Sequence, residues 1–140
     1  MQTQTQTTGE LLGEIRGKTV TRTIKEITPL GLRLELNNEG KFVGGKYTSD
    51  HIETVSVFQN LDGTFEWETK ALDVTPEGEA IVTSGRGTGK NTGPATIWAE
   101  GNLVYMTQAP RLAWLNTTKG RAVVTANNQT GEMEIKIYSR

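Results

Sequence analysis

Strict alternation of apolar and polar residues is the feature that most constrains the fold of this chain. The segment "TFEWETKALD", residues 64–73, places Phe65, Trp67 and Ala71 on one face and charged residues on the other. The segment "LGLRLELN", residues 30–37, alternates in the same way. A period of two residues is typical of a β-strand with one buried face. Because no segment sustains the 3.6-residue period of a helix, we predict an all-β protein.

Turn signals rich in Asn, Asp, Gly and Pro separate roughly eight alternating segments. These signals are "NNEG" (37–40), "LDGTF" (61–65), "TPEG" (75–78) and "NNQTG" (127–131). In "KTVTRTIKEIT" the alternation changes phase near Ile27, which indicates a β-bulge. The segment "RLAWLN" is interpreted as a further strand. Short strands joined by tight turns predict a closed antiparallel β-barrel of about eight strands, with a β-sandwich as the alternative.

Length and charge limit the classes of partner that we expect. A chain of 140 residues is long enough for one domain, which we assign to residues 9–140. Residues 1–8 alternate Gln and Thr without an apolar residue beyond Met1, which predicts a flexible tail. The 15 Lys and Arg residues are balanced by 16 Asp and Glu residues. This balance favours neither nucleic acid nor an anionic membrane surface as a partner.

The same sequence predicts a cytoplasmic protein. No apolar run approaches the ~20 residues that a membrane-spanning helix needs. The N-terminus lacks the basic and apolar regions of a secretory signal. The absence of cysteine excludes disulfides, thiolate metal sites and a cysteine nucleophile.

A glycine-rich segment, "SGRGTGKNTGP", superficially matches a phosphate-binding loop. A P-loop requires four residues between its first glycine and its Gly-Lys-Ser/Thr end, whereas three separate Gly85 from Gly89 and Asn91 replaces the hydroxyl residue. The following "ATIWAE" predicts a strand, not the helix that a P-loop opens. We therefore interpret the segment as a strand that ends in a wide glycine turn. The alternative is a barrel rim at which Arg86 or Lys90 faces an anionic ligand.

The strand containing "DGTFEWET" and the segment "GEAIVTSGRGTGKNTG" together resemble small bacterial proteins of the allene oxide cyclase-like barrel superfamily. Its uncharacterised DUF3224 group often shows a strand followed by Gly-x-Gly-Thr-Gly, matched here by Gly85, Gly87, Thr88 and Gly89. The resemblance covers the middle third of the chain and ends after Pro94. It implies a calycin-like or allene oxide cyclase-like antiparallel barrel with a central cavity, and it implies no particular catalytic residue.

Three carboxylates are candidate catalytic residues. Glu66 and Glu68 share the charged face of their segment, for which the ordinary interpretation is a solvated outer surface. If that face pointed into a barrel lumen, either residue could act as a general acid or base, as could Glu53. His51 shares a strand face with Glu53, and such a pair could supply two metal ligands. A lone histidine is a poor basis for a transition-metal site, so we expect neither a metal nor another cofactor.

Aromatic side chains are the candidate walls of a ligand pocket. Large aromatic residues fall on segments that we expect to be close in space, and they suit either a core or a flat apolar ligand. Arg111 follows a proline, where its guanidinium could hold a carboxylate at the cavity mouth or be solvated at a turn. The aromatic candidates are Trp67, Trp98, Tyr105 and Trp114.

Three functions remain open at this point. The first is a carrier or sensor that binds a small apolar or amphipathic molecule inside the barrel. The second is an enzyme of the cyclase or isomerase type, as the resemblance implies, that acts on an apolar molecule in the same pocket. The third is a structural homo-oligomer without a ligand.

Overall fold

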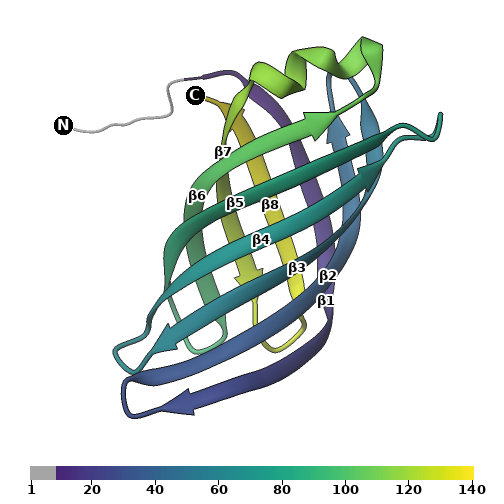
Figure 1. Cartoon of the computed structure of the whole chain (residues 1–140). Helices are drawn as coiled ribbons and strands as arrows, with labels where there is room; N and C mark the ends of the chain where they lie inside the picture. Colours follow the sequence, from purple (N-terminus) through teal and green to yellow (C-terminus); the bar gives the residue numbers. More distant parts are fainter. Residues whose placement is uncertain (1–8) are drawn as a thin grey trace.

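The computed structural model describes residues 9–140, which form a closed barrel of eight antiparallel strands (Figure 1). The tail expected at residues 1–8 lies outside the described residues. Each strand pairs with its neighbours in sequence, and β8 pairs back with β1. The predicted barrel is therefore confirmed, and the alternative β-sandwich is wrong. The elements are β1 (Leu11–Thr28), β2 (Gly31–Gly44), β3 (Thr48–Asn60), β4 (Thr64–Val74), β5 (Ala80–Asn91), β6 (Thr96–Thr107), η1 (Pro110–Thr117), β7 (Lys119–Asn127) and β8 (Glu132–Ser139).

The two-residue period decides which side chains enter the barrel. Along β4 every second residue from Phe65 to Asp73 is buried, and every residue between them is exposed. Successive side chains of a strand point to opposite faces. Once one apolar side chain points into the barrel, the face of every other side chain on that strand is therefore fixed. The resulting core lines the barrel interior and includes Ile15, Phe42, Val55, Trp67, Leu103 and Ile135.

The glycine-rich segment leaves the strand only at its end, residues 92–95, which corrects our interpretation of Gly85, Gly87 and Gly89 as part of a turn. β5 runs unbroken through it to Asn91, and its glycines occupy inward-facing positions. A Cβ built on Gly87 would lie 2.7 Å from Cζ2 of Trp67, and one on Gly85 would lie 2.5 Å from Cδ2 of Leu103. The glycines are therefore spaced by two residues because large side chains from β4 and β6 fill the space beside them.

β1 and β2 form a long hairpin whose register is irregular. The phase change near Ile27 corresponds to a register shift between Ile24 and Glu26, and a second shift lies between Thr19 and Thr21. The "NNEG" segment is not a turn, because Asn37 to Gly40 continue β2 without interruption. Pairing with β3 on one side and β1 on the other holds these residues extended, overriding their turn preference.

One end of the barrel is covered by a short 3₁₀ helix, η1, which replaces the strand expected for "RLAWLN" (Figure 1). Leu112 and Leu115 are each only 1% exposed and pack on Ile81. Their spacing of three residues puts both on the same side of a helix with three residues per turn. A two-residue period, which the strand prediction assumes, would put these two leucines on opposite faces. Within residues 9–140, no helix has the length and hydropathy needed to cross a membrane.

Candidate functional site

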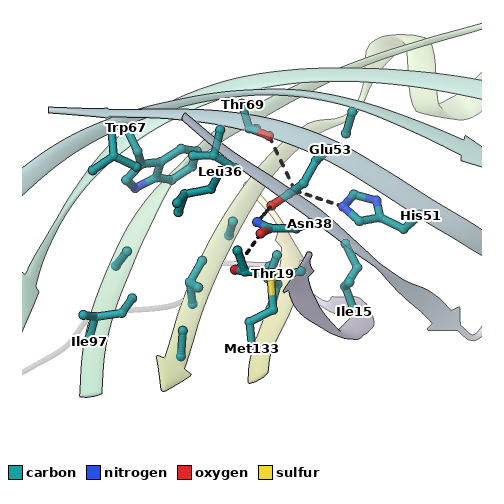
Figure 2. A pocket seen from close by; sticks show the side chains of 18 of the residues that line it. Ile15, Thr19, Leu36, Asn38, His51, Glu53, Trp67, Thr69, Ile97 and Met133 are labelled. Carbon is teal, nitrogen blue, oxygen red and sulfur yellow. Dashed lines mark hydrogen bonds and ion pairs between the residues drawn. The ribbon is translucent and has the colours of Figure 1, made fainter. Parts of the chain in front are cut away.

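The barrel encloses a cavity of about 360 Å³, which we call the lumen. It extends from the end covered by η1 to the opposite end, where Arg22 and the β7–β8 turn line it. Most of its wall is apolar, with Leu36, Trp67, Ile97 and Met133 among the side chains that face it (Figure 2). A polar sector interrupts this wall on the side formed by β1 to β4.

Glu53 is the centre of a hydrogen-bond network in this polar sector (Figure 2). Its Oε2 accepts a hydrogen bond from Nδ2 of Asn38 at 2.7 Å, and Thr19 donates its hydroxyl to Oδ1 of Asn38 at 2.7 Å. Its Oε1 lies 2.9 Å from Nε2 of His51 and 3.5 Å from the Thr69 hydroxyl, which donates to it. Both carboxylate oxygens of Glu53 therefore form hydrogen bonds with protein groups.

The network continues through His51 toward the covered end. Nδ1 of His51 lies 2.9 Å from Oδ1 of Asp73, and the Ser49 hydroxyl donates to Oδ2 of Asp73 at 2.6 Å. The side chains of His51, Asp73 and Glu53 are only 4%, 9% and 8% exposed. Ser49 contacts the carboxylate and not the imidazole, so this set lacks the serine–histidine bond of a nucleophilic triad.

Strand register explains why these side chains meet. Asn38 is the cross-strand partner of both Thr19 and Glu53, and His51 is the partner of Asp73. Directly opposed side chains on one face of an antiparallel pair lie close enough to interact. The same period that buries the apolar residues of β4 thereby points these polar residues inward.

The two carboxylates determine the charge of His51. Burial alone lowers its pKa, but the hydrogen bonds to Asp73 and Glu53, together with their charges, raise the pKa of His51 to about 9. At neutral pH the ring is therefore an imidazolium whose two N–H groups donate to the two carboxylates. Both ring nitrogens are used in this way, and residues 9–140 contain no group of three or more side chains suited to hold a metal ion.

Three of the predicted site residues line the lumen. Glu53, Trp67 and Tyr105 all face it, from β3, β4 and β6 respectively. Trp67 is 7% exposed and forms part of the apolar wall. Tyr105 lies near the covered end, where it packs on the cluster beneath η1.

Four predicted residues lie on the outer surface. For Glu66 and Glu68 this is the ordinary interpretation given above, and the alternative that turned them toward the lumen is wrong. Glu66 and Glu68 alternate with Phe65 and Trp67 on β4, and because the aromatic rings fill the interior, both carboxylates are outside. Arg86 is the cross-strand partner of Glu68, and its side chain is 81% exposed. Trp98 points outward because its neighbours Ile97 and Ala99 line the lumen.

The two remaining predicted residues belong to η1. Arg111 is not at a cavity mouth: its Nε donates to Oε1 of Glu79 at 2.8 Å and its Nη2 to Oε1 of Glu77 at 2.9 Å. Trp114 is partly buried beneath Lys46, whose ammonium lies 4.4 Å from the ring centroid. Neither side chain lines the lumen, because both belong to the 3₁₀ helix at the end of the barrel and not to a strand of its wall.

Sequence reasoning missed Asn38, Asp73, Ser49 and Thr19. Asn38 lies in the "NNEG" segment, which the sequence pattern predicts to be a turn. Asp73 could have been found, because it continues the buried positions of β4 at a spacing of two residues. A carboxylate on the apolar face of an alternating strand is the signal that predicts a buried polar site.

The fold and site define this chain as a closed eight-stranded antiparallel β-barrel with an apolar lumen and a buried carboxylate–imidazole network. Its fold is similar to that of several solved structures. A beta-barrel like protein from Acinetobacter baumannii AYE has a TM-score of 0.83 at 15% identity, over 94% of each chain. A conserved protein of unknown function from Rhodopseudomonas palustris has a TM-score of 0.80 at 14% identity, over 96% of this chain and 99% of that one.

An enzyme from Penicillium herquei has a TM-score of 0.69 at 15% identity, over 97% of this chain and 99% of that chain. At this level of identity the likeness shows a shared fold. No family model matches the sequence, and no curated protein matches it.

Proposed function

We propose that this protein binds a small molecule with an apolar body and a polar group in the lumen of the barrel. The observation that carries the proposal is the Glu53–His51–Asp73 network inside an otherwise apolar cavity. A cavity of about 360 Å³ falls in the range of small-molecule sites, which combine apolar walls with a few fixed polar groups. The wall supplies apolar contact, and the network supplies orientation.

The cost of the network supports a functional role. Burying ionised groups is unfavourable, and apolar residues of similar volume would often stabilise a core as well or better. The barrel nevertheless holds an imidazolium between two carboxylates, all of them less than a tenth exposed. Strongly perturbed titratable groups in a cavity are characteristic of functional sites.

The same network favours a second candidate function, an enzyme of the cyclase or isomerase type that moves a proton. The Glu53 carboxylate would accept a proton from one atom of the bound molecule and return it to another, with no co-reactant. His51 would hold the carboxylate in position through the 2.9 Å contact between Nε2 and Oε1. The allene oxide cyclase-like resemblance supports this candidate, and the fold is shared with an enzyme from Penicillium herquei.

Native mass spectrometry of freshly purified protein tests the binding function. We expect an organic molecule at about one per chain, which denaturation releases for identification. The fluorescent probe N-phenyl-1-naphthylamine gives an independent measurement, and we expect saturable binding with enhanced emission. Ala122→Leu, which adds volume at a lumen-facing residue that is 2% exposed, should weaken probe binding.

Val104→Leu is the matched control, because Val104 is 54% exposed on the outer surface. Absence of both a released molecule and probe binding would reject the proposal. Glu53→Gln then separates the two functions. A carrier keeps most of its affinity for the released molecule, whereas a proton-transfer enzyme loses turnover of it by roughly 10²–10⁴.

A further inference from the structure

A second polar group lines the lumen beneath η1, apart from the Glu53 network. It consists of Tyr47, Thr83 and Tyr105, three hydroxyl-bearing side chains that line the cavity. Thr83 on β5 is the cross-strand partner of Tyr105 on β6. Tyr47 precedes β3 and packs with Tyr105 on the cluster beneath the helix. We call these three groups the hydroxyl set.

The hydroxyl set has no hydrogen-bond partner among the side chains and backbone groups of residues 9–140. Thr83 is only 6% exposed, and Tyr47 and Tyr105 are half-buried. The ring of Tyr47 is held 4.7 Å from the ring of Phe42 and 6.3 Å from that of Trp114, centroid to centroid. Buried polar groups in folded proteins are nearly always paired, and an unpaired hydroxyl destabilises the structure that buries it. These hydroxyls are therefore placed to be paired by something that enters the lumen.

The chemistry of the set indicates a hydrogen-bond acceptor. Burial, followed by the negative charges of neighbouring groups including Asp73, raises the pKa of Tyr47 and of Tyr105 well above the usual phenol value. Both phenols therefore stay protonated, so each has an O–H group to donate. The nearby carboxylate oxygens of Asp73 already accept from His51 and Ser49.

The charges around the set argue against an anionic ligand. Asp73 and Glu53 lie on the adjoining wall, and their one cation, His51, donates both of its N–H groups to them. Arg22 lines the lumen at the opposite end and donates to the backbone oxygen of Asn128. A carboxylate or phosphate placed at the hydroxyl set would thus meet the negative charge of Asp73 and Glu53, whereas the cationic Arg22 lies at the opposite end of the lumen.

We propose that the hydroxyl set binds a neutral acceptor oxygen of the ligand, so that the ligand class is an apolar ketone or enone. This inference rests on the proposed binding function. It specifies the chemistry of the ligand's polar group, which the proposed function does not name. The apolar body would contact Trp67 and the wall beyond it, while the oxygen would accept from two or more of the hydroxyls.

Three probes of similar size test the proposal by isothermal titration: 2-acetylnaphthalene, 2-isopropenylnaphthalene and 2-naphthoate. The first has a neutral acceptor oxygen, the second is its hydrocarbon counterpart, and the third is an anion. We expect the ketone to bind about tenfold more tightly than the hydrocarbon, as two modest hydrogen bonds would produce. We expect the anion to bind more weakly than the ketone.

The variants Tyr105→Phe and Tyr47→Phe/Tyr105→Phe remove hydroxyls without changing the ring shape. In the double variant the ratio of ketone to hydrocarbon affinity should fall toward one, with the hydrocarbon affinity unchanged. Tyr138→Phe, outside the lumen on β8, is the matched control and should keep the wild-type ratio. Thr83→Val and its outward-facing control Thr88→Val provide a second, smaller pair of variants on β5 if the double variant does not fold.

Each outcome separates the inference from the function on which it rests. Two results would overturn the proposed role of the hydroxyl set while leaving lumen binding intact. One is hydrocarbon binding without a preference for the ketone, and the other is a ketone preference that survives in the folded variants. Failure of both neutral probes to bind would overturn this inference and count against the proposed function as well.

Discussion

His51 donates to Glu53 from the same strand, with 2.9 Å between Nε2 and Oε1 and a spacing of only two residues. The pair points into the lumen, and Asp73 from β4 occupies the other ring nitrogen. The imidazole is therefore fixed at both ends. The positive charge of His51 thus holds two carboxylates in place.

Because His51 is the single histidine of the chain, its imidazole proton resonances can be assigned without ambiguity. We expect an NMR titration to give a pKa of about 9. In Glu53→Gln this pKa should fall, because one of the two carboxylates that favour the imidazolium is gone. Glu68→Gln on the outer face is the control and should leave it unchanged. A wild-type midpoint near 6.5, the ordinary value, would contradict the proposed network.

The same pKa shift predicts how stability depends on pH. The folded pKa of about 9 exceeds the ordinary 6.5, so the contribution of His51 is fully present below pH 6.5 and is lost as pH rises through 9. The difference corresponds to about 3 kcal/mol of unfolding free energy. Urea denaturation across this pH range should show a steeper loss for the wild type than for His51→Gln. Parallel profiles for the two proteins would refute the linkage.

Close packing of β5 against Trp67 predicts that Gly87→Ala destabilises the barrel. A Cβ at Gly87 would lie 2.7 Å from the Trp67 ring and would also meet the backbone oxygen of Glu100. We expect a loss of about 1–3 kcal/mol in the free energy of unfolding, measured by denaturant titration. Gly45→Ala is the matched control, because a Cβ there has no atom within 4 Å. Equal midpoints for the two variants would show that β5 can accommodate side chains.

The cap formed by η1 should contribute strongly to stability through its two leucines. Leu115→Ala removes a side chain that is 1% exposed and leaves a cavity against Ile81, so we expect a cost of about 2–5 kcal/mol. Leu61→Ala, at a residue that is 79% exposed, should change stability by less than about 0.5 kcal/mol. A similar small effect at both positions would mean that the helix is only loosely attached.

Ligand binding should be insensitive to the charged residues outside the barrel. Glu66→Gln, Arg86→Gln and Arg111→Gln each change a side chain that does not line the lumen, so the affinity for N-phenyl-1-naphthylamine should stay at the wild-type value. Trp67→Ala removes part of the apolar wall and should lower this affinity. A loss of probe binding in Arg86→Gln or Arg111→Gln would place the site at the outer surface instead.

Local sequence patterns were sufficient for the barrel but only partly for its site. Alternation on β4 predicted its buried and exposed faces, and Trp67 was found because it lies on the buried face. Glu53 was found because it shares a strand face with His51. Asn38 was missed because its residue type favours turns when considered alone. Arg111 was misplaced because a proline and two leucines spaced by three residues fit a 3₁₀ helix better than a strand.

The sequence by itself determined the all-β class and the two faces of most strands, because side-chain direction alternates with every residue and needs no knowledge of neighbouring strands. Only the tertiary structure decided which polar residues meet. His51 and Asp73 are 22 residues apart, and Thr19 and Asn38 are 19 apart, so their contacts depend on register between strands. Register follows from the geometry of each hairpin turn, from the bulges in β1 and from the closure of the barrel, and the alternation within a single strand does not report it.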